Sequence, residues 1–170
     1  MFSFKTIRKL INFGPLILLY YLSVSEIDSH FENYFEILSF NIQLIIIYFW
    51  SSKRPEVLGG GHIFFAGLIN DVVVGFPLGL SALSYLIVSL VATYVKNMTV
   101  NTRITTDWFT FFIAIFFSNL ILFILLSNFS EIGISVTEIS YNTFFTLLFF
   151  PFFWFLFTYY NSIITTGRNA

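Results

Sequence analysis

The sequence predicts an all-α, polytopic membrane protein with six transmembrane helices and both termini in the cytoplasm. Three observations lead to this fold class. Hydrophobic residues make up 57% of the 170 residues and charged residues only 10%, with a mean hydropathy of +0.85, whereas soluble domains are far more polar. Apolar segments long enough to cross a bilayer recur along the chain. Finally, every Lys and Arg falls on one side of the resulting topology.

We expect a single integral membrane domain over residues 1–170, without a soluble domain. Its spans are expected at about residues 10–24, 35–50, 62–74, 77–95, 108–126 and 143–160. The first span follows a basic segment, which is also typical of a signal peptide. Because Ser23–Ser25 is a poor small-residue cleavage site and further spans follow, we expect this helix to be retained.

An acidic segment leads into the second span. Ser29 and Glu32 have the spacing of a capping box, which predicts a helix start at the interface. Trp50 would end the second span as an aromatic belt residue. Residues 51–61 are expected to form a loop, because Pro55 breaks helices and the glycines loosen the chain. The third span is then short for a hydrocarbon core about 30 Å thick, so it must be tilted, extended into the glycines or buried in the bundle.

The third and fourth spans are predicted to form a tight helical hairpin with a Gly-Phe-Pro-Leu-Gly turn. In a helix, Gly67, Asp71 and Gly75 would share one face, and small residues on such a face let membrane helices approach closely. Pro77 suits the first position of the fourth helix. We expect leucine at Gly67 to disrupt this packing and serine to be tolerated. The residues expected to pack the hairpin or bind a partner are Gly67, Asp71, Gly75, Pro77, Gly79 and Ala82.

Asp71 is the only ionisable residue that we expect inside the membrane. An acid at a helix centre costs about 3 kcal/mol on insertion scales and is a functional candidate by default. Asp71 also lies one turn before the bend, close to the amino end of the fourth helix, where free N–H groups and the helix dipole favour an anion. A structural anchor is the first interpretation, and a partner or ligand contact or proton transfer are the alternatives.

The last two spans are rich in aromatic residues. Trp108 is expected at the interface, and Pro151 is expected to kink the sixth helix. The segment Phe144–Tyr160 is almost entirely apolar. Its rings can face lipid, or they can form a docking face for a partner helix, and the sequence leaves both open.

The distribution of charge tests this topology independently. Six spans place the amino terminus, the loops 51–61 and 96–107 and the carboxyl-terminal tail on one side. The cations on that side are Lys5, Arg8, Lys9, Lys53, Arg54, Lys96, Arg103 and Arg168, which are all 8 of the chain. The acids on the opposite side are Glu26, Asp28, Glu32, Glu36, Glu131 and Glu138. Cytoplasmic loops collect Lys and Arg, so both termini are expected in the cytoplasm.

No catalytic or metal-binding set is evident in the sequence. Gly79-Leu80-Ser81 is similar to the Gly-x-Ser of intramembrane serine proteases, but a serine nucleophile needs a nearby base, and His62 is expected at the other end of the hairpin. An aspartyl dyad needs two close carboxylates, and the acids other than Asp71 are expected at the surfaces. Two isolated histidines make no metal site, cysteine is absent, and a net charge of −1 indicates no affinity for nucleic acid. We therefore expect no enzyme, no cofactor and no metal.

Four short motifs follow one another between Trp50 and about Lys96. They are Arg54-Pro55, Gly67-Leu68-x-x-Asp71, Gly75-x-Pro77-Leu78-Gly79 and Ala82-Leu83-x-Tyr85. This ordered set resembles the rod shape-determining protein MreD family. The resemblance covers roughly a quarter of the chain. The Gly59–Gly61 run and the sparsely charged tail have no counterpart in that pattern.

The resemblance implies a non-enzymatic subunit of the cell-wall elongation machinery in the bacterial inner membrane. Such proteins associate with MreC, a single-span protein, and through it connect MreB filaments to the wall-synthesis enzymes. The family is also similar in fold to the substrate-binding subunits of vitamin-uptake transporters. The alternative function is therefore such a subunit of a small-molecule transporter. It would need an outward-facing pocket with several polar groups, and the spans offer mainly Asn70, Asp71 and scattered serines.

Overall fold

The described part of the chain consists of helices joined by short turns. The computed structural model describes residues 12–25, 40–98, 103–129 and 136–166. Its helices are α2 (Gly14–Val24), α3 (Ile42–Lys53), α4 (Pro55–Leu58), α5 (Gly60–Val74), α6 (Leu80–Met98), α7 (Ile104–Phe129) and α8 (Val136–Thr166). The all-α class is confirmed for these residues. The capping pattern at Ser29 and Glu32 lies outside them.

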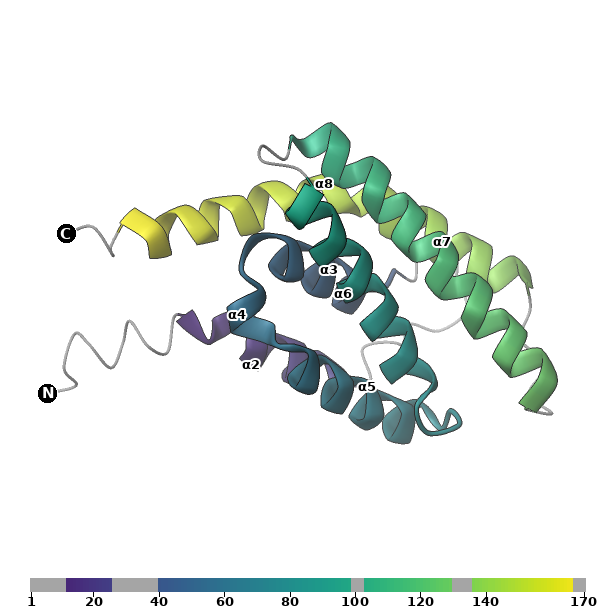
Figure 1. The fold of residues 1–170 in the computed structure, drawn as a ribbon. Coiled ribbons are helices and arrows are strands. Elements are labelled where there is room, and N and C mark those ends of the chain that lie inside the picture. Colours follow the sequence, from purple (N-terminus) through teal and green to yellow (C-terminus); the bar gives the residue numbers. More distant parts are fainter. Residues whose placement is uncertain (1–11, 26–39, 99–102, 130–135, 167–170) are drawn as a thin grey trace, which may run out of the picture.

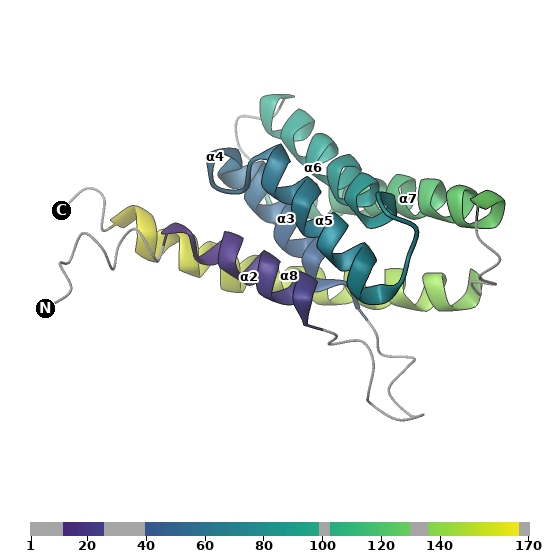
Figure 2. The same cartoon turned by 90° about the horizontal axis from the view of Figure 1, so that it is seen from below.

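Helix α3 lies at the centre of the bundle, with α2, α6 and α8 packed around it (Figures 1 and 2). Every residue from Leu44 to Ser52 is buried. A helix that is apolar all round is covered by other elements and not by solvent. The side chain of Asn41 begins the helix by accepting a hydrogen bond from the Leu44 N–H at 3.1 Å, as amino-terminal caps do. Helix α3 is therefore the core of this domain.

The helices alternate in direction, so the bundle has two distinct ends. The amino end of α2 and the carboxyl end of α8 lie at the same end, and the α5–α6 turn lies at the other (Figure 1). We call the end with residues 75–79 the hairpin end and the opposite end the basic end. The basic end carries all the cations of the described residues, namely Lys53, Arg54, Lys96 and Arg103. This clustering is what the charge argument requires, while the side of the membrane that each end faces stays a prediction.

Within the described residues, three helices are long and apolar enough to cross a membrane. They comprise Leu80–Met98, Ile104–Leu125 and Ile139–Thr165, while Gly14–Val24 and Gly60–Val74 are shorter apolar helices. The chain is thus a multi-pass membrane protein by the length and composition of its helices. The count of six spans stays a prediction.

The connection between the second and third expected spans is more ordered than the sequence suggests. Pro55 does not break helical structure there, because it is the first residue of α4, where its missing N–H is not needed. Gly59 follows with φ +54°, a conformation that favours glycine, and α5 begins directly at Gly60. The expected loop over 51–61 was therefore wrong for most of its length. Of the three explanations for the short third span, its extension into the glycines is confirmed.

Trp50 is a second correction. It was expected at an interface, but its side chain is only 1% exposed. Its ring packs against Phe49, Phe157 and Tyr160, with centroids 5.3, 6.4 and 6.0 Å away. The tryptophan is therefore part of the contact between α3 and α8, because α3 is covered on the side where lipid headgroups were expected.

Helices α5 and α6 touch backbone to backbone where Gly67 faces Ala82. A Cβ added at Gly67 would lie 2.5 Å from the Ala82 nitrogen and 2.9 Å from its Cβ. Such distances leave no room for any side chain, so the expectation that serine is tolerated at Gly67 was wrong. This contact is an example of the close approach that small residues permit in membrane helices.

Gly67→Ala should destabilise the bundle, because the added methyl group meets backbone atoms that cannot turn away. Overpacking of this kind costs about 1–3 kcal/mol. Thermal unfolding of the purified protein in detergent would show a lower melting temperature. Gly61→Ala is the matched control, since its Cβ meets nothing within 4 Å and alanine favours a helix over glycine. Equal melting temperatures for the two variants would contradict the contact.

We predict that both termini are cytoplasmic, because the cations gather at the end where α2 begins and α8 ends. A fluorescent reporter fused after Arg168 should be active, and a phosphatase reporter inserted within residues 131–138 should be active as well. Each reporter works on one side of the membrane only, so phosphatase activity at the Arg168 fusion would overturn this topology.

Candidate functional site

The α5–α6 turn depends on two glycines at its two ends. Gly75 ends α5 in the left-handed conformation, with φ +78°, and its N–H donates to the carbonyl oxygen of Asp71. Gly79 has φ +99° and lies just before α6. Both glycines supply backbone conformations that other residues rarely adopt. They do not pack the helices, contrary to the expected role of Gly75. Pro77 lies within the turn, and α6 begins three residues later than expected, at Leu80.

Asp71 is fully buried and binds the amino end of α6. Its Oδ2 accepts a hydrogen bond from the Gly79 N–H and its Oδ1 accepts one from the Ser81 N–H, both at 2.7 Å. The first N–H groups of a helix have no partner within the helix, and its dipole favours a negative charge there. The carboxylate thus joins the last turn of α5 to two backbone donors at the start of α6. This geometry is that of a structural anchor.

A network of neutral polar side chains joins four helices at the hairpin end. Gln43 on α3 donates from Nε2 to the carbonyl oxygen of Leu22 at 2.9 Å and to Asn70 Oδ1 at 3.1 Å. The hydroxyl of Tyr85 donates to Gln43 Oε1. Asn70 in turn donates to Ser81 Oγ at 3.1 Å. Gln43 therefore connects α3 to α2, α5 and α6, which the sequence analysis missed. A single glutamine in an otherwise apolar span was the available signal.

This network borders a cavity of about 340 Å³ that opens toward the hairpin end. Its polar lining is contributed by six helices or their ends and comprises Ser25, Asn41, Gln43, Asn70, Ser81, Ser84, Tyr85, Asn119 and Asn142. Only Asn70 and the serines were expected from the sequence. Asn119 donates to Thr143 Oγ1 at 2.6 Å, which ties α7 to α8 beside the cavity. The bundle thus holds more convergent polar groups than the sequence suggested.

A buried ion pair lies toward the basic end. Lys53 Nζ lies 3.1 Å from Asp107 Oδ2, and the Asp107 side chain is 1% exposed. The indole N–H of Trp154 donates to the same oxygen at 2.8 Å, and the ammonium group lies 5.9 Å from the centroid of the Trp154 ring. The acids other than Asp71 were expected at surfaces, and for Asp107 this was wrong. Three helices, α3, α7 and α8, meet at this carboxylate.

The residues considered for a serine protease lie apart. His62 Nδ1 is paired with the Tyr20 hydroxyl at 3.2 Å, near the start of α5. Ser81 lies at the other end of the hairpin and accepts the hydrogen bond from Asn70. Within the described ranges there is no group of three or more metal-ligating residues. His62 therefore does not act as a base for Ser81 in this arrangement.

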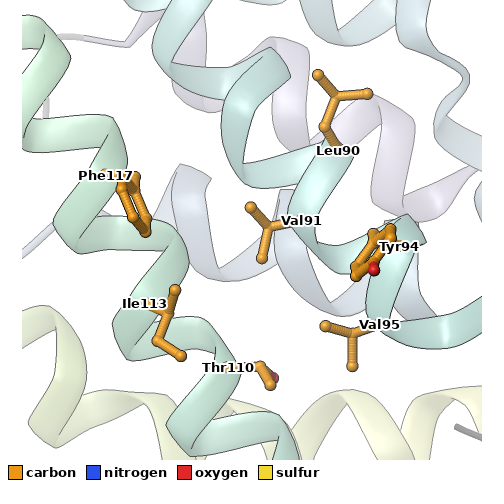
Figure 3. A pocket seen from close by; sticks show the side chains of 7 residues that line it. All are labelled: Leu90, Val91, Tyr94, Val95, Thr110, Ile113 and Phe117. Carbon is orange, nitrogen blue, oxygen red and sulfur yellow. The ribbon is translucent and has the colours of Figure 1, made fainter. Parts of the chain in front are cut away.

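An apolar groove of about 550 Å³ runs along the outer side of α6 and α7. Figure 3 shows the side chains of the two helices that line it. The groove is lined by Leu90, Val91, Tyr94 and Val95 of α6 and by Thr110, Ile113 and Phe117 of α7. Leu90, Tyr94 and Phe117 are more than half exposed. Helix α8 also exposes large rings, Phe152 and Phe155 among them, while Phe150 and Phe157 face the core.

The comparisons with known proteins gave one match. The family model described as rod shape-determining protein MreD matches residues 7–161. No curated protein and no solved structure matches the chain.

Asp71→Leu should lower stability strongly, because it leaves the N–H groups of Gly79 and Ser81 without their acceptor. Each buried donor left unsatisfied costs about 1–3 kcal/mol. Asp71→Asn keeps one acceptor oxygen at nearly the same size and should be milder. Abundance in membranes and the melting temperature in detergent would rank the two variants. Loss of function in Asp71→Asn at normal abundance would instead implicate ionisation of this carboxyl.

Lys53→Met should destabilise the protein by about 3–5 kcal/mol, because it leaves the Asp107 carboxylate buried without its cation. The double variant Lys53→Met/Asp107→Asn should recover most of this loss, since the amide still accepts from Trp154. Chemical unfolding in detergent measures both. Lys96→Met is the control at the same end, because Lys96 forms no salt bridge within the described residues. Additive effects of the two substitutions would contradict the coupling.

Proposed function

Because the chain belongs to the MreD family of rod shape-determining proteins, we propose that it is a non-enzymatic scaffold of the cell-wall elongation machinery in the bacterial inner membrane. In this role it binds an MreC-like single-span partner and, through it, the wall-synthesis enzymes. The observation that carries the proposal is the extent of the family match. Residues 7–161 include all the described helices except the last turn of α8.

The packing of the α5–α6 hairpin limits where such a partner can bind. The small-residue surface of the hairpin is not available to a partner helix, because Ala82 of the same chain occupies the space beside Gly67. Asp71 is likewise engaged by the backbone of the turn. A partner helix must therefore use another face. Of the two roles expected for these residues, packing of the hairpin is the one that the contacts of Gly67, Asp71 and Ala82 support.

The groove between α6 and α7 is the surface that we assign to the partner. Both helices are long and apolar enough to cross a membrane. A groove between them would therefore lie within the bilayer, where the transmembrane helix of a single-span partner can reach it. Its lining offers apolar and aromatic side chains with one hydroxyl, from Thr110. Association of membrane helices depends on such van der Waals packing and shape complementarity. A bulky residue in the groove should then exclude the partner.

Depletion of the protein in its native host should produce rounded cells that lose lateral wall synthesis. A tagged copy purified in mild detergent should retain the MreC-like partner, as identified by mass spectrometry. Normal cell shape after depletion would overturn the scaffold. Retention of an energising ATPase in place of the wall-synthesis partner would favour the transporter subunit.

Val91→Trp tests the groove itself. It should reduce the retained partner by about tenfold at equal membrane abundance, which corresponds to about 1.4 kcal/mol, because the indole fills the space between α6 and α7. Leu83→Trp is the matched control, since Leu83 is exposed on α6 outside the groove. If both variants retain the partner while depletion still rounds the cells, the scaffold stands and the groove is not its docking surface.

A further inference from the structure

The cavity at the hairpin end has the size and lining of a small-molecule site. Its volume of about 340 Å³ falls in the range of ligand pockets, about 300–1,000 Å³. Such pockets combine apolar walls with a few polar groups that orient the ligand. Here the apolar walls come from Phe40, Phe76, Leu22, Val73 and Leu122. The cavity lies apart from the α6–α7 groove, with which it shares no residue.

The lining determines the charge of the occupant. Its polar members are amides and hydroxyls, and among the residues that the structure describes none that lines the cavity is Asp, Glu, Lys, Arg or His. Asp71, which follows the lining residue Asn70 on α5, uses its two carboxylate oxygens to accept from the turn. A charged ligand would thus lose its hydration without gaining a partner of opposite charge from the described lining residues, which is costly. The chemistry of the cavity selects a neutral ligand.

Hydrogen-bonding capacity remains on several of the lining groups. Both N–H groups of Gln43 donate to the protein and its oxygen accepts from Tyr85, so this side chain is held in place as a wall of the cavity. Asn119 is engaged through its nitrogen only, and its oxygen accepts no hydrogen bond within the described residues. The buried hydroxyl of Ser25 has no partner in the same part of the chain. Amides and hydroxyls both donate and accept, as the hydroxyl groups of a polyol or sugar do.

We propose that this cavity binds a neutral, hydroxyl-rich small molecule of about one sugar ring. Its hydroxyl or amide groups bond to Asn119, Asn70 and Ser25, and its C–H faces pack against the aromatic and aliphatic walls. The fixed Gln43 network holds the site in shape before the ligand arrives, which lowers the cost of binding. The site goes beyond the scaffold role and does not depend on it.

Isothermal titration of the full-length protein in nanodiscs tests the site. Glucose and N-acetylglucosamine are the neutral probes, and glucosamine and glucuronate are charged analogues of matched size. At least one neutral sugar should bind saturably, and the charged analogues should bind at least about tenfold more weakly, because the described lining residues offer no opposite charge. Absence of saturable binding by either neutral sugar up to millimolar concentration would overturn the proposal. Equal binding of the charged analogues would do the same.

Two pairs of variants locate the site. Val73→Trp should abolish binding because the indole fills the cavity, whereas Val72→Trp, on the exposed neighbouring residue, should not. Asn119→Leu keeps the volume and removes the amide, so it should weaken binding about tenfold, or about 1.4 kcal/mol. Asn97→Leu, outside the cavity, is its control. Equal affinities within each pair would place any bound sugar elsewhere and refute the site.

Partner retention in the same preparations separates this inference from the scaffold. Val73→Trp should keep the single-span partner while losing the sugar. Melting temperatures would show whether each variant is folded, and if one of them is not, the other pair decides. Should the partner be lost and the sugar retained, the assignment of the cavity is overturned.

Discussion

The bond between the Asp71 carboxylate and the amino end of α6 determines the register of the whole hairpin end. By accepting from the N–H groups of Gly79 and Ser81, it positions α6 along α5. That register brings Ala82 onto Gly67, and it places Tyr85 one turn later against Gln43. A shift of one residue along α6 would separate all of these pairs at once. The two glycines of the turn make the register possible, because only they adopt its backbone conformation without strain.

The two ends of the bundle are held by different chemistry. At the hairpin end, neutral amides and hydroxyls connect α2, α3, α5 and α6 through Gln43. Toward the basic end, the charged pair of Lys53 and Asp107 joins α3 to α7, with Trp154 adding α8. Between these polar ends the contacts of the core are mainly apolar, with dispersion as their attraction. Hydroxyl pairs such as Tyr48 with Thr110 and Ser51 with Ser89 add hydrogen bonds between the helices. Helix α3 contributes side chains to both ends and to the part between them, which explains why so much of it is buried.

The sequence was a good guide to those features that polar residues and glycines specify. It predicted the hairpin, and it placed Asp71 close to the amino end of the next helix, because acids and glycines are rare in spans and have few possible roles. It was a poor guide to which apolar face is covered. In a membrane protein the lipid-facing side is as apolar as the core, so Trp50 could equally be expected at an interface or in the interior. The burial of Asp107 depends on Lys53 and Trp154, which are distant in the chain, and no local pattern reveals such a meeting.

The central position of α3 has a consequence for the synthesis of the protein. Its 12 residues extend about 18 Å at about 1.5 Å per residue, well short of a hydrocarbon core about 30 Å thick. Helix α3 leaves the ribosome before α6, α7 and α8, which supply most of its cover. A nascent chain that ends after α4 therefore holds a short helix with a lysine at its end, covered only by the part of its surface that α2 and α4 contact. Stable insertion of α3 must wait for the later helices, so carboxyl-terminal truncation should harm the second span before the first.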